Sequence, residues 1–253
     1  MNYGMTLPIS EEIDAQKYRQ TGEDFYSKIV RIAGALKDTP MHFEEFKDTL
    51  RYMRFLPAGR VQNAMGAARQ TTAYNCFVSG EIDDSMDSIM KRATQAAETM
   101  RRGGGIGYDF SRLRPRGDRI KSLDSRASGA VSFMNIYDAI CQTIASSGHR
   151  RGAQMGVLRI DHPDIEQFIT AKNDGTSLTG FNISVGVTDE FMECLEKKIP
   201  FPLKYEGKVY KEVDPVALWD MIMRSTWDWA EPGVLFIDTI NKKNNLYYCE
   251  TIE

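Results

Sequence analysis

The sequence predicts an α/β fold that follows an amino-terminal helical region, and three features support this. Apolar residues recur every three or four positions in residues 24–36 and 42–55, which is the spacing of one helix face. From residue 71 onward, runs of β-branched and aromatic residues alternate with further segments of helical spacing. With 253 residues, 42% of them hydrophobic, the chain can bury a core without disulfides or metals.

The helical region consists of two predicted helices behind a short polar arm. Pro57 and Gly59 then interrupt the helical pattern. We therefore assign residues 1–56 to an amino-terminal helical region and residues 57–253 to the α/β region. The apolar faces of the two helices are formed by Phe25, Ile29, Ile32, Ala33 and Leu36, and by Phe43, Phe46, Leu50 and Met53.

The α/β region begins with a strand in residues 71–78 that ends just beyond Cys76. An acidic turn follows at residues 80–84. Asp84 is expected to cap the next helix, with Asp87 in its first turn near the positive end of the helix dipole. The apolar face of that helix is formed by Met86, Ile89, Met90, Ala93, Ala97 and Met100.

The alternation continues to the end of the chain, without an internal repeat or a low-complexity tract. Strands are predicted at residues 106–109, 155–160, 181–187 and 234–237, helices at 130–145, 162–171, 189–197 and 216–229, and a small hairpin around 205–210.

Composition excludes several classes of protein. A formal net charge of -3 argues against bulk binding to nucleic acid. No apolar run reaches the roughly 20 residues of a membrane helix, and the first residues lack the features of a signal peptide. The protein is therefore expected to be cytoplasmic, with no membrane partner. The four cysteines lie far apart without zinc-ligand spacing, so neither a metal site nor a disulfide framework is expected.

Glycines and arginines gather in three loops. Residues 101–107, RRGGGIG, remove side chains so that backbone amides can approach an anion. A helix precedes these glycines and a strand follows them, which is the reverse of a dinucleotide-binding fold. A phosphate-binding loop and a tight packing turn remain equal alternatives here. Residues 111–119 carry four arginines and residues 146–153 form a second basic loop, and each suits either phosphate binding or simple solvation.

By residue chemistry alone, Cys76 is a small buried hydrophobe within a strand. Cys141, Cys194 and Cys249 are interpreted as structural or incidental. The histidines are His42, His149 and His162, and none has a partner at catalytic or metal-binding spacing, so none is assigned a catalytic role.

Six segments, in this order, resemble the large subunit of ribonucleotide reductase. They cover nearly the whole chain, and PAGR just before the cysteine strand is most similar to the adenosylcobalamin-dependent class II. No ATP-cone domain is found ahead of it. The segments are LPAGR at 56–60, YNCFVSG at 74–80, DDSMDSI at 83–89, GGGIGYDFSRLRPRG at 103–117, SGHRRGAQMGVLRIDHPDIEQFI at 147–169 and FNISVGVTDEFM at 181–192.

The resemblance implies the first half of a ten-stranded α/β barrel after the helical region. Cys76 then corresponds to the catalytic cysteine of the first barrel strand, which reduces the ribonucleotide and forms a disulfide with a cysteine of the carboxy-terminal half. Asn75, Gly104 and Gly105 correspond to substrate-binding positions. A thioredoxin-like or glutaredoxin-like protein is the implied reductant of the disulfide.

The same resemblance implies an allosteric site for a deoxynucleoside triphosphate. Asp84 corresponds to a residue that binds the deoxyribose and Arg114 to one near the phosphates. Residues 116–128 are then the first effector loop, and residues 148–154 the second, which carries Arg150 and Arg151. Adenosylcobalamin is the implied cofactor, and a homodimer is a possible assembly.

The resemblance also implies parts that the sequence does not contain. The family's radical-bearing cysteine lies in an Asn-x-Cys-x-Glu loop, which is expected just after residue 253, and the second half-barrel with its cysteines is missing. Cys249 lacks the flanking Asn and Glu. We therefore expect no ribonucleotide reduction by this chain alone. The alternatives are a non-catalytic effector-binding module or relic of the same fold, and an unrelated nucleotide enzyme of Rossmann type.

Overall fold

The computed structural model describes residues 5–120, 123–144 and 152–252. These divide into two compact units. The first, called the helical unit here, contains the described residues up to Cys76 together with Arg101–Gly104. The second, the sheet unit, contains the other described residues from Phe77 onward. The predicted domain boundary at residue 56 stays a prediction.

The helical unit contains four helices among its described residues, α1 (Pro8–Lys17), α2 (Phe25–Leu36), α3 (Pro40–Arg51) and α4 (Gly59–Ala64). The two predicted helices are confirmed as α2 and α3. Asp24 caps α2 by accepting a hydrogen bond from the backbone N–H of Ser27 at 2.7 Å. Thr39 caps α3 in the same way, with the N–H of His42 at 3.1 Å.

The prediction of a polar arm ahead of α2 was wrong, because those residues form α1. This helix has no continuous apolar face, and its buried residue is Asp14. The Asp14 carboxylate binds the ammonium group of Lys28 on α2 and the guanidinium of Arg19, whose Nε lies 2.7 Å away. The helix therefore packs through a buried charge cluster, which hydrophobic periodicity does not detect.

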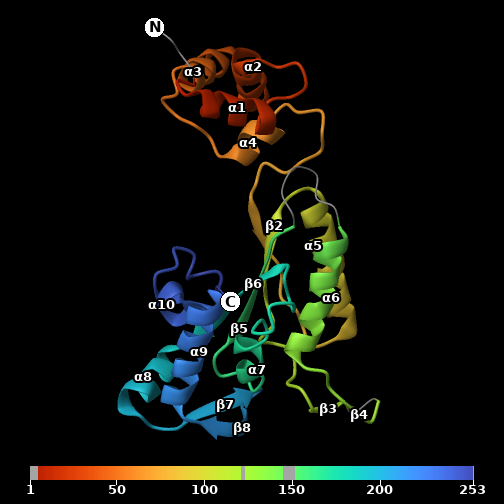
Figure 1. The fold of residues 1–253 in the computed structure, drawn as a ribbon, viewed down its shortest axis with the longest axis vertical. Coiled ribbons are helices and arrows are strands. Elements are labelled where there is room, and N and C mark those ends of the chain that lie inside the picture. The colour runs from red at the N-terminus through yellow and green to blue at the C-terminus, as the bar shows by residue number, and fades with distance from the viewer. Residues whose placement is uncertain (1–4, 121–122, 145–151, 253) are drawn as a thin grey trace. The chain divides into compact units, whose positions relative to one another are not determined.

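The sheet unit is built on a five-stranded sheet with the order β1-β2-β5-β6-β9. Successive pairs from β2 to β9 are parallel. Figure 1 shows α5 and α6 on one side of this sheet and α8, α9 and α10 on the other. The strands are β1 (Cys76–Val78), β2 (Gly105–Asp109), β5 (Gln154–Arg159), β6 (Phe181–Val187) and β9 (Gly233–Phe236), and the helices are α5 (Met86–Arg101), α6 (Ala130–Thr143), α7 (Ile165–Ile169), α8 (Asp189–Lys197), α9 (Pro215–Trp229) and α10 (Ile237–Lys242).

Most of the predicted elements are confirmed, and with them the α/β class. The predicted strand 181–187 and helix 189–197 match β6 and α8 in full. The predicted hairpin is longer than expected, with β7 (Phe201–Tyr205) antiparallel to β8 (Lys208–Val213). A hairpin with strands of two residues each was not predicted; it pairs β3 (Arg119–Ile120) with β4 (Ser125–Arg126). The predicted strand 71–78 is shorter in the structure, where β1 has three residues.

Helix α5 corrects two expectations. Its first turn is capped by Ser85, whose hydroxyl accepts a hydrogen bond from the backbone N–H of Ser88 at 3.2 Å, and not by Asp84. Its buried face is formed by Ile89, Ala93, Ala96 and Met100, whereas Met86 and Met90 are exposed. The Asp84 carboxylate is thereby available for another partner.

Candidate functional site

The predicted redox residue lies at the start of the edge strand β1. Cys76 is the first residue of β1, its thiol is exposed, and it forms no disulfide. Asn75 beside it is also exposed. The structural interpretation of Cys76 requires burial, and its exposure argues against that interpretation. By contrast, Cys141 on α6 is buried, and burial raises the pKa of its thiol above the usual value.

The glycine loop leads into the neighbouring strand β2. Gly104 is buried just before β2, and Gly105 is its first residue. Gly103 has a φ of 84°, so the tight turn predicted as one alternative is present at this position. Backbone hydrogen bonds from Thr72 N to Arg102 O and from Ser79 N to Gly107 O join the two segments in the same direction. Cys76 and Gly105 therefore begin adjacent strands.

The predicted effector residues follow the carboxyl ends of the same two strands. Asp84 and Arg114 are thirty positions apart, and the Asp84 carboxylate accepts hydrogen bonds from Arg114 Nε at 2.5 Å and from the Arg114 backbone N–H at 3.2 Å. This hydrogen bond raises the pKa of the Arg114 guanidinium. The structure thus brings Asp84 and Arg114 together and leaves them at the end of the strands opposite to Cys76. Arg150 and Arg151 lie outside the described residues.

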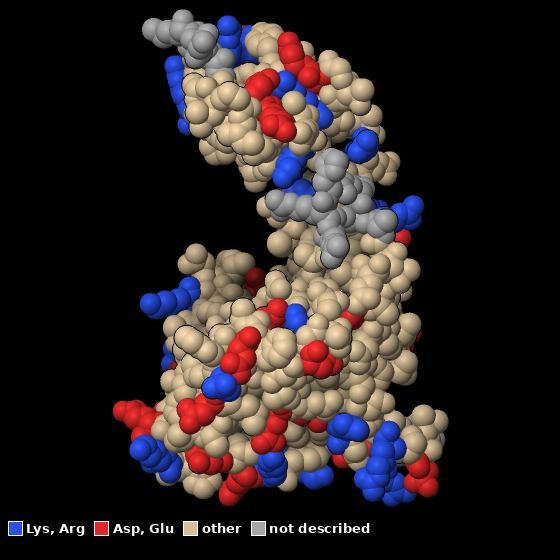
Figure 2. Space-filling model, viewed as in Figure 1, with Lys and Arg blue, Asp and Glu red and all other residues tan. Residues whose placement is uncertain are grey.

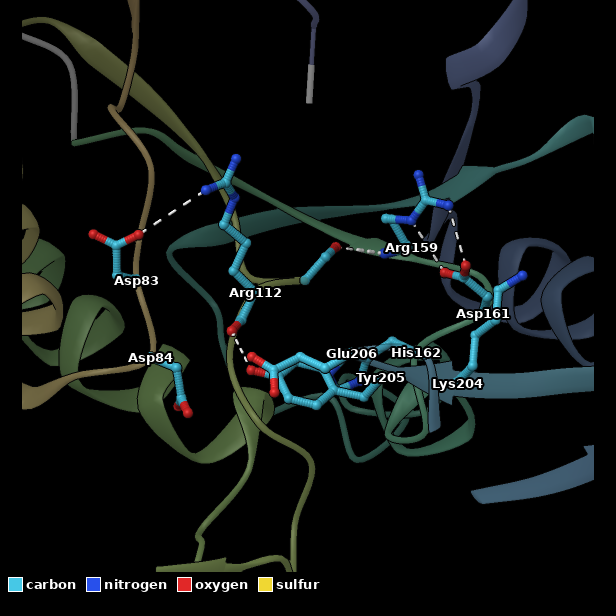
Figure 3. A pocket seen from close by; sticks show the side chains of 11 residues that line it. Asp83, Asp84, Arg112, Arg159, Asp161, His162, Lys204, Tyr205 and Glu206 are labelled. Carbon is cyan, nitrogen blue, oxygen red and sulfur yellow. Dashed lines mark hydrogen bonds and ion pairs between the residues drawn. The ribbon is translucent and has the colours of Figure 1, made fainter. Parts of the chain in front are cut away.

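A pocket of about 820 Å³ is lined in part by Asp84 (Figure 3). Its charged residues are largely paired: Arg112 binds Glu81 through two hydrogen bonds of 2.7 and 2.8 Å, and Arg159 binds Asp161 through two of 3.1 Å. Four carboxylates and three cationic side chains line it, so the lining does not favour a polyanion. The lining residues are Asp83, Asp84, Ser111, Arg112, Arg159, Asp161, His162, Lys204, Tyr205, Glu206 and Gly207.

His162 forms the buried wall of this pocket and was not expected to have a role. It is 2% exposed, and its Nδ1 accepts a hydrogen bond from the backbone N–H of Asp164 at 3.0 Å. The other nitrogen, Nε2, therefore carries the proton and donates to the carbonyl oxygen of Leu113 at 2.8 Å. Burial lowers the pKa of His162 below its usual value, so the ring is neutral at pH 7.

This lowered pKa predicts a pH-dependent stability. As pH falls through 6.5, the unfolded chain binds a proton at His162 before the folded chain does, so the free energy of unfolding falls with pH down to the lowered pKa of the folded chain. One such group adds at most about 1.4 kcal/mol per pH unit. We expect His162→Gln, which keeps a donor for Leu113, to have a shallower dependence. Urea unfolding between pH 5 and 7.5, followed by the fluorescence of Trp219, Trp227 and Trp229, measures the difference, and parallel curves would contradict the prediction.

Charges of both signs are mixed on the face of the sheet unit that is seen in Figure 2. Figure 2 shows Asp and Glu interspersed with Lys and Arg on the face in view, so that face is not a uniformly basic surface for nucleic acid. Among the described residues, no cluster of three or more potential metal ligands occurs. The described helices include none with the length and apolar character needed to cross a bilayer.

Comparisons with known proteins place these features in a family. The family described as "Ribonucleotide reductase, barrel domain" matches residues 74–253. The "Vitamin B12-dependent ribonucleoside-diphosphate reductase" of Mycobacterium tuberculosis H37Rv is 42% identical over 204 residues, which are 79% of this chain and 29% of the relative. The protein of the same name from Thermoplasma acidophilum is 38% identical over 207 residues, 80% of this chain and 27% of the relative. This chain thus spans less than a third of the length of these curated relatives.

A solved structure has the same fold. The chain superposes on the Actinobacillus ureae class Id ribonucleotide reductase alpha subunit with a TM-score of 0.79. The match covers 96% of this chain and 43% of that one, at 20% sequence identity. At this identity the likeness concerns the fold, which includes the parallel sheet with Cys76 in its edge strand β1.

Proposed function

This chain belongs to the ribonucleotide reductase family, and on that basis we propose that it supplies the reducing thiol and the effector site of a ribonucleotide reductase. The remaining part of the barrel then comes from a carboxy-terminal half. The observation that carries the proposal is Cys76, an exposed thiol at the first residue of the edge strand β1, inside the segment that matches the barrel domain. An edge strand can accept further barrel strands as partners.

The proposed reaction replaces the 2′-hydroxyl of a ribonucleotide by hydrogen. Cys76 and one cysteine of the carboxy-terminal half give two electrons and two hydrogens, the hydroxyl leaves as water, and the two sulfurs form a disulfide. An external dithiol protein, thioredoxin-like or glutaredoxin-like, reduces this disulfide. A thiyl radical supplied by the carboxy-terminal half initiates the reaction. Asn75 and the backbone at Gly104 and Gly105 orient the substrate.

The cofactor of the proposed enzyme is adenosylcobalamin, because the relatives at 38–42% identity are named as vitamin B12-dependent. It would supply the initiating radical. The pocket beside Asp84 is lined by paired charges, and a second pocket, between α5 and α6, is a shallow apolar groove. Neither lining suits a corrin ring and the polar groups that this ring carries.

The proposed effector is a deoxynucleoside triphosphate bound by Asp84 and Arg114. These two side chains bind each other, so the nucleotide must replace their contact: the deoxyribose hydroxyl would donate to the Asp84 carboxylate while Arg114 turns to a phosphate. Arg116 is exposed on the same loop and is a further phosphate ligand. A homodimer remains a prediction.

Reconstitution tests the proposal. The chain is mixed with the part of the Mycobacterium tuberculosis relative that follows the matched segment, in the presence of adenosylcobalamin, a dithiol and CDP or CTP. We expect deoxynucleotide only in the complete mixture, with CDP preferred because that relative is named for diphosphates. A covalent fusion of the two parts removes failed assembly as a cause of inactivity. No product from a folded fusion that binds adenosylcobalamin would contradict the proposal.

A further inference from the structure

The loop that carries Arg114, residues 112–119 and called the arginine loop here, is attached to the rest of the sheet unit at many points. Four side chains from two other segments contact it. His162 and Asp164 come from the turn after β5, and Tyr205 and Tyr210 come from the β7–β8 hairpin. None of the four was assigned a role from the sequence, and none belongs to the proposed effector contacts.

Asp164 ties the two ends of the longer segment 116–130 together. Its carboxylate accepts hydrogen bonds from the backbone N–H of Arg116, at 3.0 and 3.1 Å, and from that of Ala130, at 3.2 Å. It is 8% exposed, so water cannot readily replace it. A side chain at Gly129 would place its Cβ 2.6 Å from this carboxylate, which explains the glycine there.

The other contacts lie on either side of Arg114. His162 donates to the carbonyl of Leu113. The hydroxyl of Tyr205 donates to the carbonyl of Arg112 at 2.7 Å, a contact drawn in Figure 3, and its ring packs edge-on against His162. The hydroxyl of Tyr210 donates to the carboxylate of Asp118 at 2.9 Å. The backbone is therefore held at residues 112 and 113 before Arg114 and at residue 116 after it.

We propose that Asp164, His162, Tyr205 and Tyr210 are positioning residues of the effector site, which hold the arginine loop in the conformation that binds a deoxynucleotide. This inference rests on the proposed effector role of Asp84 and Arg114. Because the backbone is held on both sides of Arg114, at residues 112, 113 and 116, only the Arg114 side chain must reorient when a nucleotide binds. A loosened loop must be ordered at the moment of binding, and this lowers the affinity.

The test compares dTTP binding by the full chain and by Asp164→Asn, using isothermal titration. In the asparagine variant an N–H₂ group replaces one acceptor oxygen and faces backbone donors. We expect the Kd for dTTP to rise about tenfold or more. Hydrogen exchange at residues 112–119 should quicken in the same variant without ligand. Asp84→Ala, which removes a proposed ligand, serves as the reference for lost binding.

The matched control is Asp138→Asn. Asp138 is also a buried carboxylate that accepts a backbone N–H, that of Gly180 at 2.8 Å, but it contacts no part of the arginine loop. We expect comparable thermal destabilisation and a Kd within about twofold of wild type. If Asp164→Asn does not fold, the double variant Tyr205→Phe and Tyr210→Phe removes two hydroxyls only and should raise the Kd severalfold.

The possible outcomes separate the two proposals. Equal affinity of wild type and Asp164→Asn, or equal losses in Asp164→Asn and Asp138→Asn, would overturn the positioning role and leave the effector site intact. Absence of dTTP binding by wild type would overturn both. A selective loss in Asp164→Asn, together with faster exchange of the arginine loop, supports the inference.

Discussion

Replacing Cys76 by serine is expected to abolish deoxynucleotide formation in the reconstituted reductase. A serine hydroxyl can neither give up the hydrogen and electron nor form the disulfide, so we expect a loss of at least about a thousandfold. The side chain is exposed at the first position of an edge strand, where the exchange of sulfur for oxygen disturbs no packing. Unfolding and dTTP binding should therefore be unchanged. Product formation, normalised to assembled protein, is the measurement.

Cys249→Ser is the matched control, because Cys249 is the other exposed cysteine among the described residues. Its thiol donates to the carbonyl of Leu246 at 3.4 Å and lacks the neighbours that a radical-bearing cysteine requires. We expect near wild-type activity from this variant. Activity of the Cys76→Ser enzyme within tenfold of wild type would contradict the role assigned to Cys76, as would equal losses in both variants.

The second large effect is expected in the helical unit. Lys28 and Asp14 are 2% and 1% exposed and form a buried ion pair, and Lys28 Nζ also donates to Gln62 Oε1 at 3.1 Å. Lys28→Met leaves the Asp14 carboxylate buried with Arg19 as its remaining cation. Removal of one partner of such a pair costs about 3–5 kcal/mol, and we expect the lower end because Arg19 remains.

The measurement is the hydrogen exchange of α2 amides with increasing urea, because the three tryptophans lie in the sheet unit and do not report on the helical unit. Lys47→Met is the control: Lys47 pairs on α3 with Glu44, whose side chain is 62% exposed, and an ion pair with an exposed partner contributes little. Equal effects of the two substitutions would show that the buried pair does not hold α1 against α2.

The fold was predictable where one face of an element is buried by apolar residues. Helix α8 was located in full because Phe191 and Cys194 face the core at helical spacing. Strand β6 was located in full because Ile183, Val185 and Val187 face the core at every second position. Helix α1 was not predicted, because its buried residue is the charged Asp14 and not an apolar side chain. Helix α4 and the β3–β4 hairpin were too short to produce a period, and Pro57 and Gly59 indicated a break where a six-residue helix begins.

Sequence motifs predicted the reactive and ligand-binding side chains of the candidate site. They did not predict the residues that hold the arginine loop in place. Cys76, Asp84 and Arg114 were predicted from ordered motifs and stay predictions as site residues, although the structure brings the last two into contact. Asp164, His162 and Tyr205 act on backbone atoms of a loop far away in sequence. Such hydrogen bonds depend on tertiary structure, and neither residue type nor residue spacing predicts them. The one local signal was His162 and Asp164 in the turn directly after a buried strand.

The central claim is that Cys76 is oxidised as the ribonucleotide is reduced, and a single turnover tests it most directly. The reconstituted enzyme is prereduced, freed of external dithiol, supplied with adenosylcobalamin, dTTP and CDP, and then quenched with a thiol-blocking reagent. Peptide mass spectrometry is expected to recover Cys76 in a disulfide with a cysteine of the carboxy-terminal half, in proportion to the deoxynucleotide formed. Deoxynucleotide formed while Cys76 is recovered entirely as the blocked free thiol would contradict the claim.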